Sequence, residues 1–154
     1  IMEWVLDQHR LYENPLMTEE GHKEIKNLMS KHSVSIPSVT GDCFMQSPFY
    51  KTSGNERDGL LKDLNNVIQN SVLLGIKFIV IPLVDEGRLE NESQERKLKD
   101  GMTSIKPVLA ETGVVICFES DFNPEKLANF IDQFERSNSL SRILAKDNIN
   151  FVVF

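Results

Sequence analysis

Hydrophobic residues along this chain fall into two alternating patterns. Short apolar runs rich in Val, Ile and Phe predict β-strands. Runs of this kind without a polar residue at every second position are typical of parallel strands that are buried on both faces. The five predicted strands cover roughly 1–6, 33–39, 76–84, 113–119 and 149–154.

Between these runs, apolar residues recur three and four positions apart, which predicts amphipathic helices. The helices are expected from Thr18 onwards, over about 56–74, over about 93–111, from Asn123 onwards, and over about 137–147. Thr18 and Asn123 are typical N-cap residues, and Pro124 suits a first helical position. Pro107 lies inside the third helix and predicts a kink or a break there.

Strands that alternate with helices predict an α/β fold with a parallel sheet and right-handed connections. Two architectures remain open, an open doubly wound sheet and a TIM barrel built from (β/α) units. A complete barrel needs eight strands and usually about 250 residues, whereas this chain has 154. Five strands are too few for a closed barrel, so residues 1–154 are expected to form either an open doubly wound sheet or a single, partial TIM-barrel-like domain, and the motifs described below favour the second.

Charge and composition narrow the classes of partner. The formal net charge of −6 argues against non-specific binding to nucleic acid or to an anionic membrane. Neither a spanning apolar run nor a signal-peptide pattern is visible in the sequence, so a cytoplasmic protein is expected. Cys43 and Cys117 lie far apart without metal-type spacing, and are expected to be reduced thiols in the core.

The strongest candidate for chemistry is the run Val114–Asp121, where a strand ends abruptly in the carboxylate of Glu119. Parallel α/β folds place their ligands at the carboxyl ends of the strands. Asp42, His9 and Arg88 also follow predicted strands, so all four side chains are expected on the same rim of the sheet.

Several short motifs occur in order along the chain, and together they resemble a known family. They are Met2-Glu3-Trp4, Asn14-Pro15-Leu16, Asp42-Cys43-Phe44-Met45, Ile81-Pro82-Leu83-Val84-Asp85 and the strand-end Glu119. The set is similar to the sugar phosphate isomerase/epimerase family, whose members have xylose isomerase-like TIM barrels. Relatives in that group include hexulose-phosphate, tagatose-type and psicose-type epimerases and, more distantly, endonuclease IV.

The resemblance implies a divalent metal ion, Mn, Mg, Co or Zn, held by Glu, Asp, His and Glu from four successive strands. Glu119 corresponds to the first of these ligands, and the other three would follow Phe154. The implied reaction is isomerisation or epimerisation next to a carbonyl of a sugar or sugar phosphate, through an enediolate. In it Glu119 would be a metal ligand and a catalytic acid/base, and Glu125, six residues later, would contact the substrate.

Each candidate also has a structural interpretation. Glu119 could form a salt bridge, Asp42 a turn after Gly41, and Arg88 part of a solvated loop. Glu125 is explained equally well by a helix start. His9 lies on the expected rim, whereas His22 and His32 fall on or near a helix and are expected at the surface.

Two functions from different classes follow. The first is a metal-dependent isomerase or epimerase with a small-molecule sugar or sugar phosphate as substrate. The second is a non-catalytic partial barrel that covers its exposed edge strands by pairing with another copy or subunit. In either case a homo-oligomer is expected. Nucleic-acid repair of the endonuclease IV kind is disfavoured by the acidic balance.

Overall fold

A five-stranded parallel sheet organises the protein, with the strand order β1-β2-β3-β4-β5. The computed structural model describes residues 1–136 and 152–153. The strands are β1 (Glu3–Val5), β2 (Ser38–Thr40), β3 (Phe78–Leu83), β4 (Val115–Ser120) and β5 (Val152–Val153). The helices are α1 (Glu19–His32), α2 (Asp42–Gln46), α3 (Gly54–Leu73), α4 (Glu92–Thr112) and α5 (Pro124–Arg136), with 3-10 turns η1 (Leu11–Glu13), η2 (Pro15–Met17) and η3 (Asp85–Gly87).

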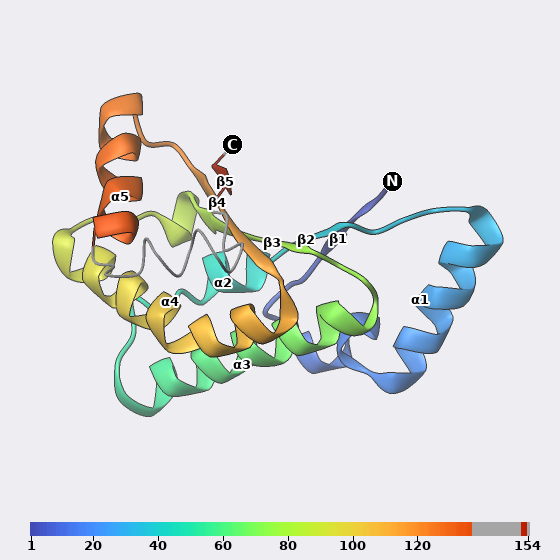
Figure 1. Ribbon diagram of the computed structural model, residues 1–154. Coiled ribbons are helices and arrows are strands. Elements are labelled where there is room, and N and C mark those ends of the chain that lie inside the picture. The colour runs from blue at the N-terminus through green and yellow to red at the C-terminus, as the bar shows by residue number, and fades with distance from the viewer. Residues whose placement is uncertain (137–151, 154) are drawn as a thin grey trace.

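The predicted order of strands and helices is confirmed, and so is the α/β architecture. Neighbouring strands are consecutive in sequence and all pairs are parallel. Figure 1 shows α3 and α4 lying beside one another along one side of the sheet, with α1 near the β1 edge and α5 near β4. The sheet is open, because β1 and β5 are its two edges and do not pair with one another. The predicted helix over 137–147 lies outside the described residues.

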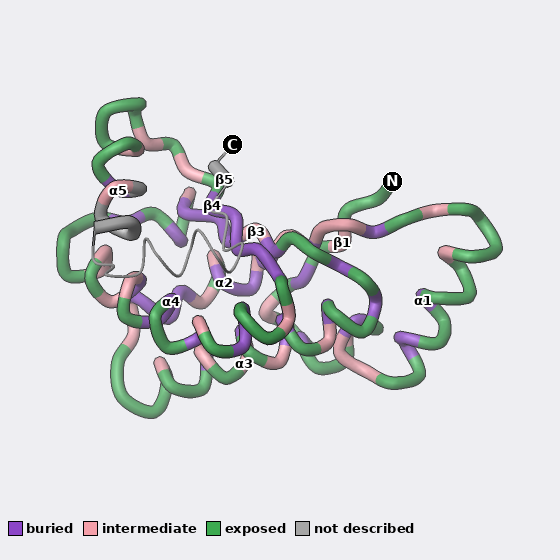
Figure 2. Tube along the Cα trace, viewed as in Figure 1, coloured by how far each residue is buried: buried purple, intermediate pink, exposed green. Residues whose placement is uncertain are grey.

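The two faces of the sheet differ in how far they are buried. Side chains alternate between the two faces along each strand. The pairing register groups the residues of neighbouring strands into two sets, one of which faces the helices. These helix-facing residues are almost completely buried: Val39, Ile79, Ile81, Leu83, Ile116 and Phe118. On the opposite face, called the inner face below, exposure varies: Val5 is 53% exposed and Phe78 is 38% exposed, whereas Val115 and Cys117 are buried. Figure 2 shows buried residues concentrated in β3 and β4 and on the sheet-facing sides of α3 and α4.

Side-chain caps start the helices where the sequence predicts. The Thr18 hydroxyl accepts a hydrogen bond from the Gly21 N–H at 3.1 Å, and the Asn123 side chain accepts one from the Lys126 N–H at 2.8 Å. Pro107, however, does not break α4, which continues through it to Thr112. Because Pro107 is exposed, the backbone carbonyl that loses its partner there can be hydrated.

The start of α1 packs tightly against the preceding turn η2. His22 is buried, and its Nε2 lies 2.6 Å from the Leu16 carbonyl oxygen. The prediction that His22 is a surface residue is therefore wrong, because the turn folds back over that side of the helix. His32, at the other end of α1, is exposed as predicted.

Both cysteines are buried thiols, as the sequence predicts. Burial raises the pKa of the Cys43 thiol to about 12, so this group stays protonated at neutral pH. No helix in the described part of the chain is long and apolar enough to cross a membrane.

Gly21 tests the close contact between α1 and η2. A Cβ added there would lie 2.1 Å from the Pro15 carbonyl oxygen, so Gly21→Ala should destabilise the fold by about 1–3 kcal/mol. Gly59→Ala is the matched control: it is also helical, but nothing lies within 4 Å of the new methyl group. It should stabilise by about 0.5–1 kcal/mol. Urea unfolding of both variants measures the difference, and equal effects would contradict the packing described.

Candidate functional site

Glu119 lies at the carboxyl end of β4 and belongs to the inner face of the sheet. Its neighbour Phe118 packs edge-to-face against Phe130 of α5, with ring centroids 5.8 Å apart, so Phe118 faces the helices. Successive strand residues point to opposite faces, and Glu119 therefore points away from the helix layer. It is exposed, and within residues 1–136 its carboxylate has no hydrogen-bond or ion-pair partner. The salt bridge that the sequence left open for Glu119 is thus not formed by these residues.

A second group of polar side chains connects the carboxyl end of β1 with α2. Asp7 accepts hydrogen bonds from the His9 N–H at 2.9 Å and from the Gln46 amide at 3.2 Å. The Gln46 side chain in turn accepts one from the Gln8 N–H at 2.9 Å. The hydrogen bonds from His9 and Gln46 lower the pKa of Asp7 because they stabilise its charged form, and the bond from His9 has the larger effect.

Asp42 begins α2 directly after β2, where the sequence predicts a rim residue. Its pKa is raised, first because it is partly removed from water and then because the carboxylates of Asp7 and Glu3 are close. Asp42 and Glu119 both lie two residues beyond one row of paired residues, Thr40, Val80 and Cys117. β3 lies between their two strands, so Asp42 and Glu119 are on the same rim of the sheet but belong to non-adjacent units.

Arg88 forms an ion pair with Asp121, which links the loop after β3 to the loop after β4. Both side chains are about half exposed, so water weakens this pair. Tyr50 stabilises the loop that carries Arg88. This residue is buried, and its hydroxyl donates a hydrogen bond to the Gly87 carbonyl. Arg88 therefore lies on the predicted rim, but its guanidinium group is already paired with the Asp121 carboxylate.

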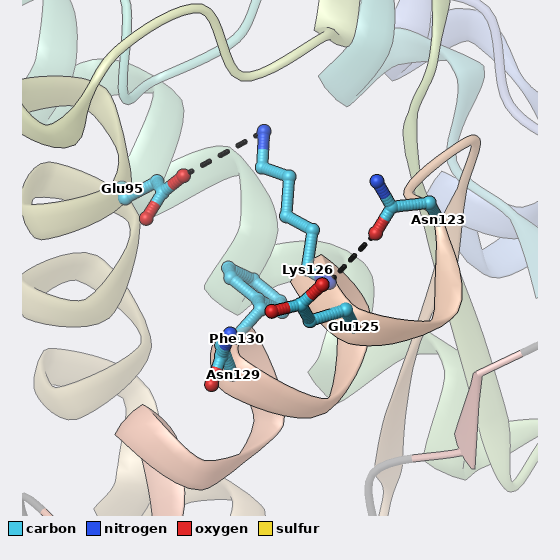
Figure 3. A pocket seen from close by; sticks show the side chains of 6 residues that line it. All are labelled: Glu95, Asn123, Glu125, Lys126, Asn129 and Phe130. Carbon is cyan, nitrogen blue, oxygen red and sulfur yellow. Dashed lines mark hydrogen bonds and ion pairs between the residues drawn. The ribbon is translucent and has the colours of Figure 1, made fainter.

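Glu125 lies on the other side of the sheet from Glu119. It lines a pocket of about 230 Å³ between α4 and α5, shown in Figure 3. Phe130, which faces the helix side of β4, lines the same pocket. The two glutamates that the sequence assigns to one substrate site are therefore not brought together around one cavity.

Sequence reasoning found the strand-end positions but not all of their partners. Glu119 lies at the carboxyl end of β4, and Asp42, His9 and Arg88 follow strands at the same edge. His9 contributes its backbone N–H to Asp7, and no hydrogen bond of its side chain is described. Gln46 was missed because α2 is too short to show a helical repeat. Asp121 was missed as the partner of Arg88, although its position two residues after Glu119 was a usable signal.

The described residues can be compared with what a divalent metal requires. A catalytic ion of this kind is usually held by three or more protein ligands. In residues 1–136 and 152–153, no three His, Cys, Asp or Glu side chains converge in a way that could hold one. Glu119 offers a single carboxylate, so the described residues do not by themselves form the metal site that the resemblance implies.

The raised pKa of Asp42 predicts how the stability of the fold depends on pH. Because its pKa is higher in the folded state, that state binds more protons, and stability falls as the pH rises from the unfolded pKa of about 3.9 through the folded pKa. Asp42→Asn should therefore raise the melting temperature at pH 7, and the gain should disappear below about pH 3.9. Asp100→Asn, at an exposed position on α4, should show no such gain. Thermal unfolding across this pH range checks it, and a lower melting temperature for Asp42→Asn at pH 7 would contradict it.

Comparison with known proteins identifies the family and the fold of this chain. The family model described as "Xylose isomerase-like TIM barrel" matches residues 2–151. No curated protein sequence matches the chain. Among solved structures, the chain is similar to the apo form of 3-keto-D-glucoside 4-epimerase YcjR from E. coli, with a TM-score of 0.53 and 13% sequence identity over 98% of this chain and 78% of that chain. A likeness at this identity supports the fold. The parallel α/β sheet and the family match over nearly the whole chain show that this chain belongs to the xylose isomerase-like TIM barrel family.

Proposed function

We propose that this chain acts in an isomerase or epimerase whose substrate is a sugar or sugar phosphate. The fold is that of a family with sugar isomerase and epimerase members, and the similar solved structure is named as a sugar epimerase. The observation that carries the proposal is Glu119: an exposed carboxylate without a partner in residues 1–136, at the carboxyl end of a strand and on the inner face.

The proposed reaction is proton transfer at a carbon next to a carbonyl group. Glu119 takes the proton from that carbon, the electron pair of the C–H bond forms a C=C bond, and the π pair of the carbonyl moves to its oxygen, which gives an enediolate. Return of a proton to the opposite face of the same carbon gives the epimer. Return of the proton to the former carbonyl carbon, with transfer of the neighbouring hydroxyl proton to the enediolate oxygen, gives the isomer. Asp42 is a candidate for the second acid/base, because its raised pKa favours the protonated form.

Solvent exchange tests this proposal directly. In D2O, the protein should incorporate deuterium next to the carbonyl of a ketose substrate, with D-fructose, D-tagatose and D-fructose 6-phosphate as probes and proton NMR as the measurement. Loss of a general base typically costs about 10²–10⁴-fold in rate, so Glu119→Gln should reduce exchange by that amount. The control is Glu111→Gln, an exposed glutamate at the far end of α4. Undiminished exchange in Glu119→Gln would rule out the assigned role.

Metal dependence is a second part of the proposal. We propose that Glu119 is one ligand of a divalent ion whose other ligands come from outside the described residues. Titration calorimetry with Mn²⁺ tests this without an activity assay: Glu119→Gln should weaken binding by at least about tenfold, and Glu111→Gln should leave it unchanged. Equal Mn²⁺ affinity of Glu119→Gln and the parent protein would exclude Glu119 as a ligand.

A second candidate function is association between copies of the chain through the β1 edge. Among the described residues β1 pairs with β2 alone, and beside it lies an apolar groove of about 290 Å³ whose lining includes Trp4, Ile25 and Leu28. Leu28 is 44% exposed, and Met2, also in the lining, is 52% exposed. An edge strand flanked by apolar surface favours pairing with another chain.

Light scattering after size-exclusion chromatography checks this association. The parent protein should run as an oligomer, and Leu28→Lys should shift it to the monomer because a charge would be buried in the interface. Leu73→Lys is the control, because Leu73 is 56% exposed on α3 and does not line the groove. A monomeric parent protein, or an oligomer insensitive to Leu28→Lys, would contradict the proposed interface.

A further inference from the structure

The pocket between α4 and α5 is separate from the Glu119 site. It opens between the first turns of the two helices and is lined by Glu95, Asn123, Glu125, Lys126, Asn129 and Phe130. Phe130 packs against Phe118 on the helix-facing side of β4, so the sheet lies between this pocket and Glu119. Whatever binds here is not the group that Glu119 contacts.

Local helix geometry brings the lining side chains together. Lys126 and Phe130 are four residues apart on α5, as are Glu125 and Asn129, so each pair lies one above the other on the helix surface. In Figure 3 the Lys126 side chain extends from α5 towards Glu95 on α4. The Lys126 ammonium also lies 4.0 Å from the centre of the Phe122 ring, a cation–π contact that helps to hold this side chain in place.

The polar groups of the pocket retain much of their hydrogen-bonding capacity. The Lys126 ammonium and the Glu95 carboxylate are 3.9 Å apart, too far for a direct hydrogen bond but suitable for a bridging hydroxyl group. Asn123 uses its oxygen to cap α5, which leaves its amide N–H groups available. Within residues 1–136, the side chains of Glu125 and Asn129 have no hydrogen-bond partner.

This combination selects the chemical class of the ligand. Carboxylates only accept hydrogen bonds, the ammonium group only donates them, and amides do both, so the set suits hydroxyl groups, which both donate and accept. Two carboxylates against one ammonium disfavour phosphate. In the described residues no cluster of ligands suits a metal ion. The volume is below the range of about 300–1,000 Å³ typical of pockets for drug-sized ligands, which favours a single ring.

We propose that this pocket binds a neutral polyhydroxylated ring of monosaccharide size, with one hydroxyl bridging Glu95 and Lys126 and others contacting Glu125 and Asn129. The proposal does not depend on catalysis at Glu119. It assigns Glu125 to a binding site on the helix side of the sheet rather than to the catalytic rim.

Amide-detected NMR of the whole chain tests the pocket, with methyl β-D-glucopyranoside as the probe. Saturable shifts are expected for the side-chain amides of Asn123 and Asn129 and for the backbone amide of Lys126. Cyclohexanol, a ring of similar size with one hydroxyl group, should produce no saturable shifts at these positions. Absence of saturation with the glucoside, or equal shifts with cyclohexanol, would overturn the proposal.

Variants identify the groups that bind. Glu95→Gln and Asn129→Ala should each weaken glucoside binding by about threefold to tenfold, the loss typical of one hydrogen bond. Asn65→Ala, at an exposed position on α3, is the matched control and should leave affinity unchanged. The same spectra show whether each variant is folded. Glu119→Gln should also bind normally. Loss of glucoside shifts in Glu119→Gln, with retention in Glu95→Gln and Asn129→Ala, would place the sugar on the rim and overturn the proposal.

Discussion

Burial of one face of the sheet under α3 and α4 is the constraint on which the rest of this structure depends. Ile79, Ile81, Ile116 and Phe118 are at most 1% exposed on that face. Because side chains alternate along a strand, this burial decides the direction of every neighbouring residue. A one-residue shift of β4 would place Glu119 among the helices, where an unpaired carboxylate is strongly unfavourable.

The same constraint gathers polar residues from consecutive units at one edge. All five strands are parallel, so the loops after β1, β2, β3 and β4 begin on the same side of the sheet. Asp7 and Gln46 connect the first two of these units, and Arg88 and Asp121 connect the next two. Loops held by a rigid sheet are where α/β proteins place functional groups. Partial removal from water raises the pKa of Asp42, and the nearby carboxylates of Asp7 and Glu3 raise it further.

The free edge at β1 and the inner face present a contrasting surface. Val5 and Phe78 are partly exposed on the inner face, and the groove beside β1 is apolar. In a closed barrel, strands pair on both sides and the inner face is filled by layers of side chains. Here the groove beside β1 and the part of the inner face around Val5 and Phe78 are exposed to water, so further contacts there would bury additional apolar surface.

Local patterns in the sequence determined the elements of this protein. Apolar runs located the strands, and the cap residues Thr18 and Asn123 located two helix starts, because these signals depend only on neighbours in the chain. Motifs in order pointed to the barrel family, and the strand ends pointed to Glu119 and Asp42. Tertiary structure alone decided how distant segments meet. It buried His22 against Leu16, paired Arg88 with Asp121, and placed Glu125 across the sheet from Glu119. These contacts join residues from different turns and units, so they depend on how the sheet packs against its helices rather than on spacing along the chain.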